Sequence, residues 1–336
     1  MTAGRAVRMK PWDALTEAGR HRRLRSLALA ALEQFPVKPG RLRLVGGFTN
    51  VIYRVDSPTG PHALRVDLMQ DHTDRDVEIE VAWLEALGTD TDLDVARPVR
   101  TRSGGQYAYA GAEGVPGARR CTLFEWIPGR PIADHLSPGV YHKLGVLSAR
   151  LHQHGARFTP PARPMPWDQV FYWPDDVDPY VLDRPEHAHH ITRANRRTLE
   201  RAVEVATDAF ERLPEGRAQI VHGDLHPWNV HQSRGRLYAL DFEDVMWADP
   251  VQDLAITLFY ERDRAEYAAL RSSFEGGYRT VAPWPASYDG EIEHFMAART
   301  LMFINFVLNL DDDPAGFFAR AFPRLEAFLE RWARPT

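Results

Sequence analysis

The sequence contains a single cysteine, Cys121, and few features of an exported or membrane-bound chain. With one thiol no intramolecular disulfide can form, so we expect a reducing compartment. The N-terminal residues lack the apolar core of a secretory signal peptide. The longest late apolar stretch, residues 301–310, is too short and too interrupted to cross a bilayer. These absences predict a cytoplasmic protein that does not bind membranes.

The sequence also lacks an excess of positive charge. Its formal net charge is -5 at pH 7, whereas nucleic-acid binders need a basic surface for phosphate contacts. We therefore expect no nucleic-acid partner, and we interpret the arginine cluster at residues 20–25 as a solvated helix face. Hydrophobic residues make up 44% and charged residues 26% of the 336 residues. This composition is typical of a globular enzyme, and the length leaves room for two lobes.

A stretch at residues 220–241, IVHGDLHPWNVHQSRGRLYALD, combines three polar side chains that suit phosphoryl transfer. Asp224 lies in a short loop, Asn229 follows five residues later, and Asp241 ends a predicted hairpin. Transfer of a phosphoryl group from ATP to a hydroxyl needs an acceptor for the hydroxyl proton and cations that neutralise the phosphate oxygens. Asp224 can accept the proton, and Asn229 and Asp241 offer the oxygen ligands that Mg²⁺ prefers. The alternative is a hairpin whose Asp and Asn side chains only cap turns.

The segment H-G-D-L-H-P-W-N, residues 222–229, resembles the catalytic loop of the aminoglycoside phosphotransferase and choline kinase-like family. This family is related to the protein kinases, whose own loop reads H-R-D-x-x-x-x-N. The segment L-D-F-E similarly resembles D-F-G and places Asp241 in the metal position. The resemblance implies ATP and magnesium as cofactors and Asp224 as the catalytic residue.

The resemblance extends over nearly the whole chain and implies an α+β, two-lobed protein-kinase-like fold. A small N-terminal lobe, residues 1–125, would contain an antiparallel sheet, bind the nucleotide and end in a hinge. A mostly helical C-terminal lobe, residues 126–336, would hold the catalytic loop and the acceptor site. Apolar periodicity and capping residues predict the helices of the chain at residues 16–34, 73–87, 137–155, 192–213, 262–278, 290–310 and 314–332.

A glycine-rich segment, GGFTN at residues 46–50, separates two predicted strands at residues 41–45 and 51–55. Two glycines let the backbone approach a ligand closely, and successive N–H groups can cradle phosphates. An ordinary β-turn uses the same residues. The candidate nucleotide contacts here are Gly46, Gly47, Thr49 and Asn50.

The next predicted strand, residues 62–67, carries an arginine where the resembled enzymes have lysine. In kinase-like folds this lysine holds the nucleotide phosphates and pairs with a glutamate of the following helix. Arg65 keeps the positive charge and can bind phosphate with two hydrogen bonds, but its planar head cannot copy an ammonium. Glu80 is the preferred partner and Glu78 the alternative. Plain solvated charges are the other interpretation of all three residues.

The last strand of the N-terminal lobe ends in L-F-E-W-I-P-G, residues 123–129. The resemblance implies that this segment is the hinge and that backbone groups there bind adenine. On that register, the Glu125 carbonyl and the Ile127 N–H would make the contacts.

Three further features of the C-terminal lobe are interpreted from the sequence. Asp253 is expected to hold the catalytic loop by a backbone hydrogen bond, as the resemblance implies, while His152 and His154 are expected on the surface. Residues 160–185 mix aromatic and acidic side chains. They predict either a lid that selects a cationic or amino-bearing acceptor or a surface loop pinned by its aromatics.

The function predicted from the sequence is ATP- and Mg-dependent phosphorylation of a hydroxyl. The acceptor would be a small, amino-bearing molecule such as an aminoglycoside, an amino alcohol or a homoserine-like compound. One alternative within the family is a Ser/Thr protein kinase. An alternative of another class is a non-catalytic nucleotide-binding regulator, suggested by Arg65 in place of lysine. The sequence predicts no oligomeric state.

Overall fold

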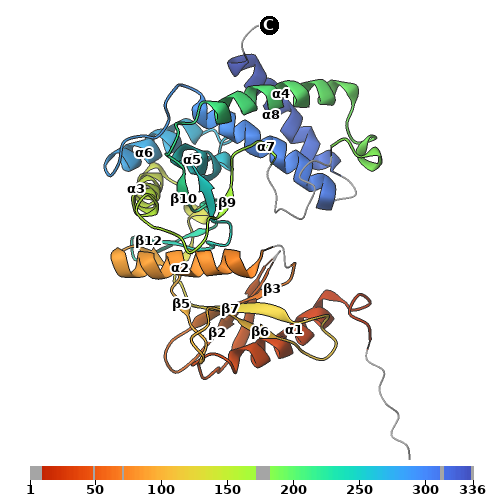
Figure 1. The fold of residues 1–336 in the computed structure, drawn as a ribbon, viewed down its shortest axis with the longest axis vertical. Coiled ribbons are helices and arrows are strands. Elements are labelled where there is room, and N and C mark those ends of the chain that lie inside the picture. The colour runs from red at the N-terminus through yellow and green to blue at the C-terminus, as the bar shows by residue number, and fades with distance from the viewer. Residues whose placement is uncertain (1–9, 48–49, 70–71, 172–181, 311–313, 334–336) are drawn as a thin grey trace, which may run out of the picture. The chain divides into compact units, whose positions relative to one another are not determined.

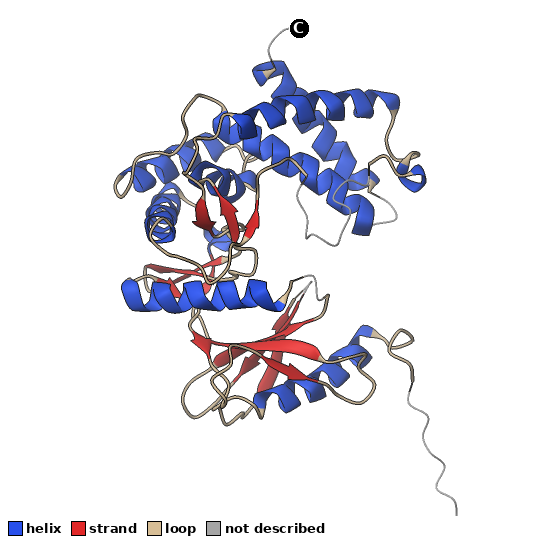
Figure 2. Cartoon of the chain, in the orientation of Figure 1, coloured by secondary structure: helices blue, strands red, loops and turns tan. Residues whose placement is uncertain are grey.

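The computed structural model describes residues 10–47, 50–69, 72–171, 182–310 and 314–333. The chain forms two compact units, Met1–Pro128 and Gly129–Thr336. The first unit contains an antiparallel sheet and two helices, and the second is mostly helical, as the blue and red elements of Figure 2 show. The predicted α+β class is therefore confirmed.

The sheet of the first unit is antiparallel throughout. Its main path runs β1 (Leu42–Gly46), β2 (Asn50–Val55), β3 (His62–Asp67), β7 (Arg119–Glu125) and β5 (Pro98–Val99), with β6 (Ala108–Ala110) paired to β7. The residue pattern over 95–102 predicts a single strand, but the structure has β4 (Asp94–Val95) and β5 as separate short pieces. Pro98 is the first residue of β5 and pairs with Phe124 of β7, a position at which a strand tolerates proline.

Helix α1 (Glu17–Leu32) packs against this sheet (Figure 1). Thr16 caps its N-terminus by accepting a hydrogen bond from the Gly19 N–H, which confirms the predicted start. Leu24 and Leu27 on the helix share one core with Val51 and Leu64 of the sheet. Cys121 is also buried in this core, and burial raises the pKa of its thiol to about 12.

Helix α2 (Asp74–Asp90) begins at a capping box. The Thr73 side chain accepts from the backbone of Asp76, and the Asp76 carboxylate accepts from the Thr73 N–H. The box fixes the register of the helix. In that register Glu80 lies on the buried side, together with apolar residues such as Trp83 and Leu84.

The second unit contains six helices among the described residues. They are α3 (Pro138–Gly155), α4 (Arg193–Glu211), α5 (Pro250–Phe259), α6 (Tyr267–Arg279), α7 (Glu291–Leu310) and α8 (Ala315–Trp332), with short 3-10 turns at Ile132–His135 and Pro185–His187. Ser137 caps α3 and Pro138 occupies its first turn, as predicted. In the described part of the chain, no helix is long and apolar enough to cross a membrane.

Two small sheets of the second unit carry the central stretch of the sequence. Strand β13 (Met246–Ala248) pairs with β10 (Gln219–Val221) and β9 (Met165–Pro166), and strand β11 (Val230–Ser233) pairs with β12 (Arg236–Ala239) and β8 (Arg130–Pro131). The hairpin between β11 and β12 turns at Arg234 and Gly235, both with positive φ, as the Ser-Arg-Gly signal predicted. The loop 222–229 therefore lies between β10 and β11, and Asp241 follows β12.

Candidate active site

The loop at residues 222–229 begins with a buried histidine, His222, which anchors it. Burial lowers the pKa of His222, so its ring is neutral at pH 7 and can both donate and accept. Nε2 lies 2.9 Å from the Leu240 carbonyl oxygen, and Nδ1 lies 3.3 Å from the Asp224 amide nitrogen. The ring also packs on Phe242, with 4.4 Å between centroids. His222 thus joins the start of the loop to the segment that carries Asp241.

A second buried group holds the loop from the side of α5. The Gly223 N–H donates to Asp253 Oδ1 at 2.8 Å, which is the backbone bond expected for Asp253. Gly223 has φ +80, and a Cβ there would lie 2.0 Å from the Asp244 carbonyl oxygen. Only glycine fits this position without moving the backbone.

The same aspartate corrects one prediction from the sequence. His152 was expected on the surface, but it is 4% exposed and its Nε2 lies 2.8 Å from Asp253 Oδ2. Burial would raise the pKa of Asp253, but the hydrogen bond and charge of His152 hold it below the ordinary value. The His152 ring therefore supports the catalytic loop through Asp253.

The Asp224 carboxylate contacts three side chains, those of Arg299, His226 and Asn229. Its Oδ1 accepts a hydrogen bond from Arg299 Nη2 at 2.7 Å, and its Oδ2 lies 3.2 Å from His226 Nε2. Burial alone would raise the pKa of Asp224, but the hydrogen bond with His226 and the charge of Arg299 outweigh it and lower that pKa. The carboxylate is therefore ionised at neutral pH and can accept hydrogen bonds only.

Asn229 is oriented by the same carboxylate. Its Nδ2 donates to the Asp224 carbonyl oxygen at 3.0 Å and to Asp224 Oδ2 at 3.3 Å. The amide nitrogen is used in these contacts, which leaves the amide oxygen to face another ligand. The Leu240 N–H donates to the Asn229 carbonyl at 2.9 Å. This backbone hydrogen bond joins Asn229 to the residue that precedes Asp241.

Asp241 has a left-handed backbone, with φ +62. Its side chain is exposed, while the next residue, Phe242, is 1% exposed. The unusual backbone thus turns a carboxylate outward next to a buried ring. One carboxylate and one amide oxygen are the hard donors that a magnesium site takes from a protein when phosphates and water complete the shell. In the described ranges, no group of three or more His, Cys, Asp or Glu side chains could hold a metal ion.

Sequence reasoning missed two neighbours of Asp224, namely Arg299 and His226. His226 stands inside the recognised motif, but its contact with Asp224 depends on the turn of the loop. Arg299 lies 75 residues further along the chain, in a helix whose other residues read as core. Its only signal is a charged residue in the apolar segment A-A-R-T-L-M-F-I.

In the first unit, Arg65 and Glu80 form the contact expected from the sequence. Arg65 Nη1 donates to Glu80 Oε1 at 2.9 Å, and Nη2 bonds to Oε2. Both side chains are buried, at 9% and 2% exposure, and the Arg65 guanidinium lies 5.2 Å from the Phe124 ring centroid. Arg65 therefore pairs with Glu80, the preferred partner, and not with the alternative, Glu78. The role of the pair in nucleotide binding stays a prediction.

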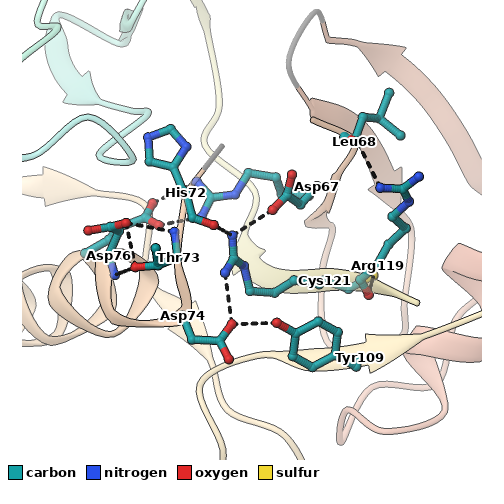
Figure 3. Close-up of polar contacts among 12 residues, drawn as sticks. Asp67, Leu68, His72, Thr73, Asp74, Asp76, Tyr109, Arg119 and Cys121 are labelled. Atoms are coloured by element: carbon teal, nitrogen blue, oxygen red, sulfur yellow. Dashed lines mark hydrogen bonds and ion pairs between the residues drawn. The ribbon is translucent and has the colours of Figure 1, made fainter. Parts of the chain in front are cut away.

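The start of α2 is attached to the sheet by a second buried arginine, Arg120 of β7. Its guanidinium donates to Asp67 Oδ2 at 2.7 Å, to the His72 carbonyl at 2.6 Å and to Asp74 Oδ1 at 2.9 Å. Figure 3 shows Asp67, His72 and Asp74, and it shows Tyr109, whose hydroxyl also donates to Asp74. This cluster fixes the first turn of the helix that carries Glu80.

The glycine-rich segment is only partly described. Thr49 lies outside the described residues, together with Phe48. Gly47 has φ +137, and a Cβ there would lie 1.7 Å from the Asn50 carbonyl oxygen, so the turn requires glycine. Gly46 ends β1 and Asn50 begins β2, where it pairs with Asp67 of β3. The role of the four residues in phosphate binding stays a prediction.

The predicted hinge residues lie at the end of β7. Glu125 is the last residue of the strand and is exposed, and its N–H donates to the Arg97 carbonyl at 2.8 Å. Ile127 is 9% exposed, and within the described parts of the chain its N–H has no hydrogen-bond partner. An N–H in that state suits an adenine contact, which stays a prediction.

The predicted lid, residues 160–185, falls partly outside the described residues, which end at 171 and resume at 182. Trp167, which precedes the gap, is 1% exposed and packs on Phe210 and Phe295 with centroid distances of 6.0 and 5.9 Å. Its carbonyl accepts a hydrogen bond from Gln252. Trp167 is therefore core, which favours the pinned-loop interpretation for this residue.

Comparison with known proteins connects this geometry to an enzyme family. The model of the Phosphotransferase enzyme family matches residues 41–284. An uncharacterised protein of Synechocystis sp. is 27% identical over 241 residues, which cover 69% of this chain and 63% of the relative. The chain thus spans under two thirds of that relative's length.

Two solved structures have the same fold. A microcompartment-associated aminopropanol kinase superposes with a TM-score of 0.72 at 21% identity, covering 91% of this chain and 95% of the other. The amicoumacin kinase hAmiN, solved with AMP-PNP, Ca²⁺ and amicoumacin, superposes with a TM-score of 0.71 at 18% identity, covering 90% and 92%. These likenesses confirm the predicted kinase-like fold, and the family match confirms the predicted family. The chain belongs to the Phosphotransferase enzyme family.

Proposed function

We propose that this protein transfers the γ-phosphoryl group of ATP, with magnesium, to a hydroxyl of a small, amino-bearing acceptor. The observation that carries the proposal is the loop around Asp224. One ionised carboxylate, one oriented amide and one outward carboxylate lie on a single loop and hairpin, held by the buried His222 and Asp253. Hydroxyl phosphorylation needs these groups together.

Asp224 would orient the acceptor hydroxyl and take its proton. As the acceptor oxygen bonds to the γ-phosphorus, the bond from that phosphorus to the bridging oxygen breaks and ADP leaves. The proton passes to the Asp224 carboxylate, whose lowered pKa suits an orienting group more than a strong base. In the loose transition state of phosphoryl transfer, orientation contributes most of what the protein supplies.

Asn229 and Asp241 would hold magnesium through their side-chain oxygens. When bound, the ion neutralises charge on the transferring phosphate. Arg65, paired with Glu80, would keep a positive charge near the nucleotide phosphates. The remaining proposed nucleotide contacts are Gly46, Gly47, Thr49, Asn50, Glu125 and Ile127.

Two observations support a small-molecule acceptor. The structural relatives described above are named for aminopropanol and amicoumacin. In this chain, Trp228 is 51% exposed and lies beside His226 and Tyr260, with centroid distances of 5.5 and 5.9 Å. Trp228 is two residues from His226, which contacts the proposed base Asp224. An exposed indole at this position suits contact with an ammonium group or an apolar face of the acceptor. None of the three proteins reported above is named as a protein kinase.

A panel of amino alcohols, aminoglycosides and sugars tests the proposal. ADP release is measured with ATP and Mg²⁺ for each compound, and the phosphorylated product is identified by mass spectrometry. We expect at least one amino-bearing alcohol to raise ADP release above the rate without acceptor. Release that no compound stimulates, together with labelled protein when labelled ATP is added to lysate, would replace the small-molecule acceptor by a protein.

Removal of divalent cations is expected to reduce ADP release to background, and added Mg²⁺ to restore it. Asp241→Asn should raise the Mg²⁺ concentration needed for half-maximal rate by about tenfold or more, because an amide oxygen is a weaker ligand than a carboxylate. Asp208→Asn, which changes an exposed carboxylate on α4, serves as the control. An unchanged Mg²⁺ requirement in Asp241→Asn would remove Asp241 from the metal site.

Trp228→Ala is expected to raise the KM for the acceptor by about tenfold while the KM for ATP stays unchanged. The reason is that a desolvated contact of an ammonium or apolar group with an indole contributes roughly 1 to 2 kcal/mol. Steady-state kinetics with each substrate varied in turn gives both constants, and the KM for ATP is the internal control. An unaltered acceptor KM would show that the indole does not contact the acceptor.

A further inference from the structure

Arg299 is a buried charge on the apolar helix α7. Its side chain is 6% exposed, and a buried guanidinium is costly unless it is paired and hydrogen-bonded. Its Nη2 donates to Asp224 Oδ1 at 2.7 Å and lies 3.2 Å from the Tyr260 hydroxyl oxygen. The side chain thus reaches from α7 to the proposed catalytic residue and to the end of α5.

Three aromatic rings enclose the Arg299 guanidinium. Its central carbon lies 4.9 Å from the Phe303 centroid, 5.8 Å from that of Phe259 and 5.9 Å from that of Tyr260. Cation–π contacts of this kind are strongest where the cation is desolvated. The rings leave the guanidinium little freedom, so the oxygen that it binds is held in one place.

The two oxygens of Asp224 have different surroundings. Oδ1 receives the short bond from Arg299 at 2.7 Å. Oδ2 has longer contacts, at 3.2 Å to His226 Nε2 and 3.3 Å to Asn229 Nδ2. A carboxylate oxygen can accept more than one hydrogen bond, and Oδ2 is the oxygen whose protein contacts are longer.

From this asymmetry we propose that Arg299 is a positioning residue for phosphoryl transfer, fixing Asp224 through Oδ1 so that Oδ2 receives the acceptor hydroxyl. The inference rests on the proposed function. Arg299 acts through Asp224 and does not itself touch the acceptor. It also offsets the negative charge of Asp224, so the amino group of the acceptor is recognised by other residues. Loss of Arg299 therefore changes kcat and leaves both KM values nearly unchanged.

The rival account is a structural role, in which Arg299 only joins α7 to the loop. Removing it would then lower stability without a specific loss of turnover. Arg271 provides a matched control, because it forms a partly buried ion pair from α6 to Glu293 of α7. Its loss also removes an arginine–carboxylate contact to the same helix, but it does not involve Asp224.

The test compares Arg299→Met, Arg299→Lys and Arg271→Met, each in the wild-type and the Asp224→Asn background. Turnover is ADP release with Mg²⁺, ATP and the panel compound that the wild-type protein uses fastest. We expect kcat to fall about 100-fold in Arg299→Met, the size of effect that a small misplacement produces. Arg299→Lys should recover most of this loss, because the ammonium can still donate to Oδ1. Arg271→Met should stay close to wild type.

The Asp224→Asn background separates positioning from general stability. There we expect Arg299→Met to cost no further turnover, because the carboxylate that it orients is gone. The inference is overturned if Arg299→Met keeps wild-type kcat, if only KM changes, or if its loss is equally large in both backgrounds. If Arg299→Met does not fold, Arg299→Gln replaces it in the same comparison. A wild-type protein that turns over no panel compound would overturn the proposed function and this inference with it. If the wild type is active and the Arg299 variants keep its kcat, the inference alone is overturned.

Discussion

Asp224→Ala is expected to lower kcat by about 10²- to 10⁴-fold, the range in which positioned acid–base groups contribute. The KM for ATP should stay near the wild-type value, because Asp224 is proposed to act on the acceptor. Single-turnover ADP release measures the loss of kcat, and calorimetry measures ATP binding. Asp208→Ala, which removes an exposed carboxylate from α4, is the control and should be fully active. Equal turnover in Asp224→Ala would remove this residue from the mechanism.

The alanine variant also has a structural cost that must be separated from catalysis. Arg299 would lose its carboxylate partner while remaining buried, and breaking a buried ion pair from one side costs about 3–5 kcal/mol. Asp224→Asn keeps the shape of the side chain and an oxygen that can accept from Arg299. We therefore expect Asp224→Asn to fold better than Asp224→Ala and to show a similarly low kcat.

Arg65→Ala is expected to lower the free energy of unfolding by about 3–5 kcal/mol, because it leaves the buried Glu80 carboxylate unpaired. Urea denaturation followed by circular dichroism measures this change. ATP affinity should fall as well if the Arg65 charge lies near the phosphates. Arg65→Lys keeps the charge but loses one of two hydrogen bonds and the planar contact with Phe124, so an intermediate effect is expected.

Arg100 is a matched control for Arg65, because its glutamate partner lies on the same helix, α2, as Glu80. Arg100 binds Glu85 of α2 with two hydrogen bonds, but the pair is exposed, at 46% and 35%. Exposed pairs contribute about 0–1 kcal/mol, so Arg100→Ala should be nearly neutral. If Arg65→Ala and Arg100→Ala destabilise equally, burial is not what makes the Arg65 pair important. A wild-type ATP affinity in Arg65→Ala would discard its proposed role with the nucleotide.

The sequence predicted those parts of the fold that depend on local signals. Apolar spacing at two helices and the Ser137 cap at a third predicted their starts within one residue, and the Ser-Arg-Gly turn predicted the hairpin. Such signals act within a few residues of the chain. The single strand expected over 95–102 was wrong, because the structure divides this segment into the short strands β4 and β5.

Contacts made across long separations were harder to predict. Asp224 and Asn229 stand in one contiguous motif, whereas Arg299 approaches Asp224 only after α5 and α7 have packed together. His152 was placed on the surface because its helix position suited a solvated cation, but it pairs with Asp253, 101 residues away. In both cases the missing information was which buried charge finds which partner, and that is decided by packing.

The left-handed backbone of Asp241 lowers the stability of the fold, but it presents a carboxylate that is proposed to bind magnesium. A residue with a Cβ in this conformation costs on the order of 1 kcal/mol relative to glycine. Glycine at position 241 would relax the turn and at the same time delete the outward carboxylate. Because Asp241 is a proposed magnesium ligand, selection for heat resistance alone would favour a residue that removes this ligand, and a stabilising library should hold residue 241 fixed.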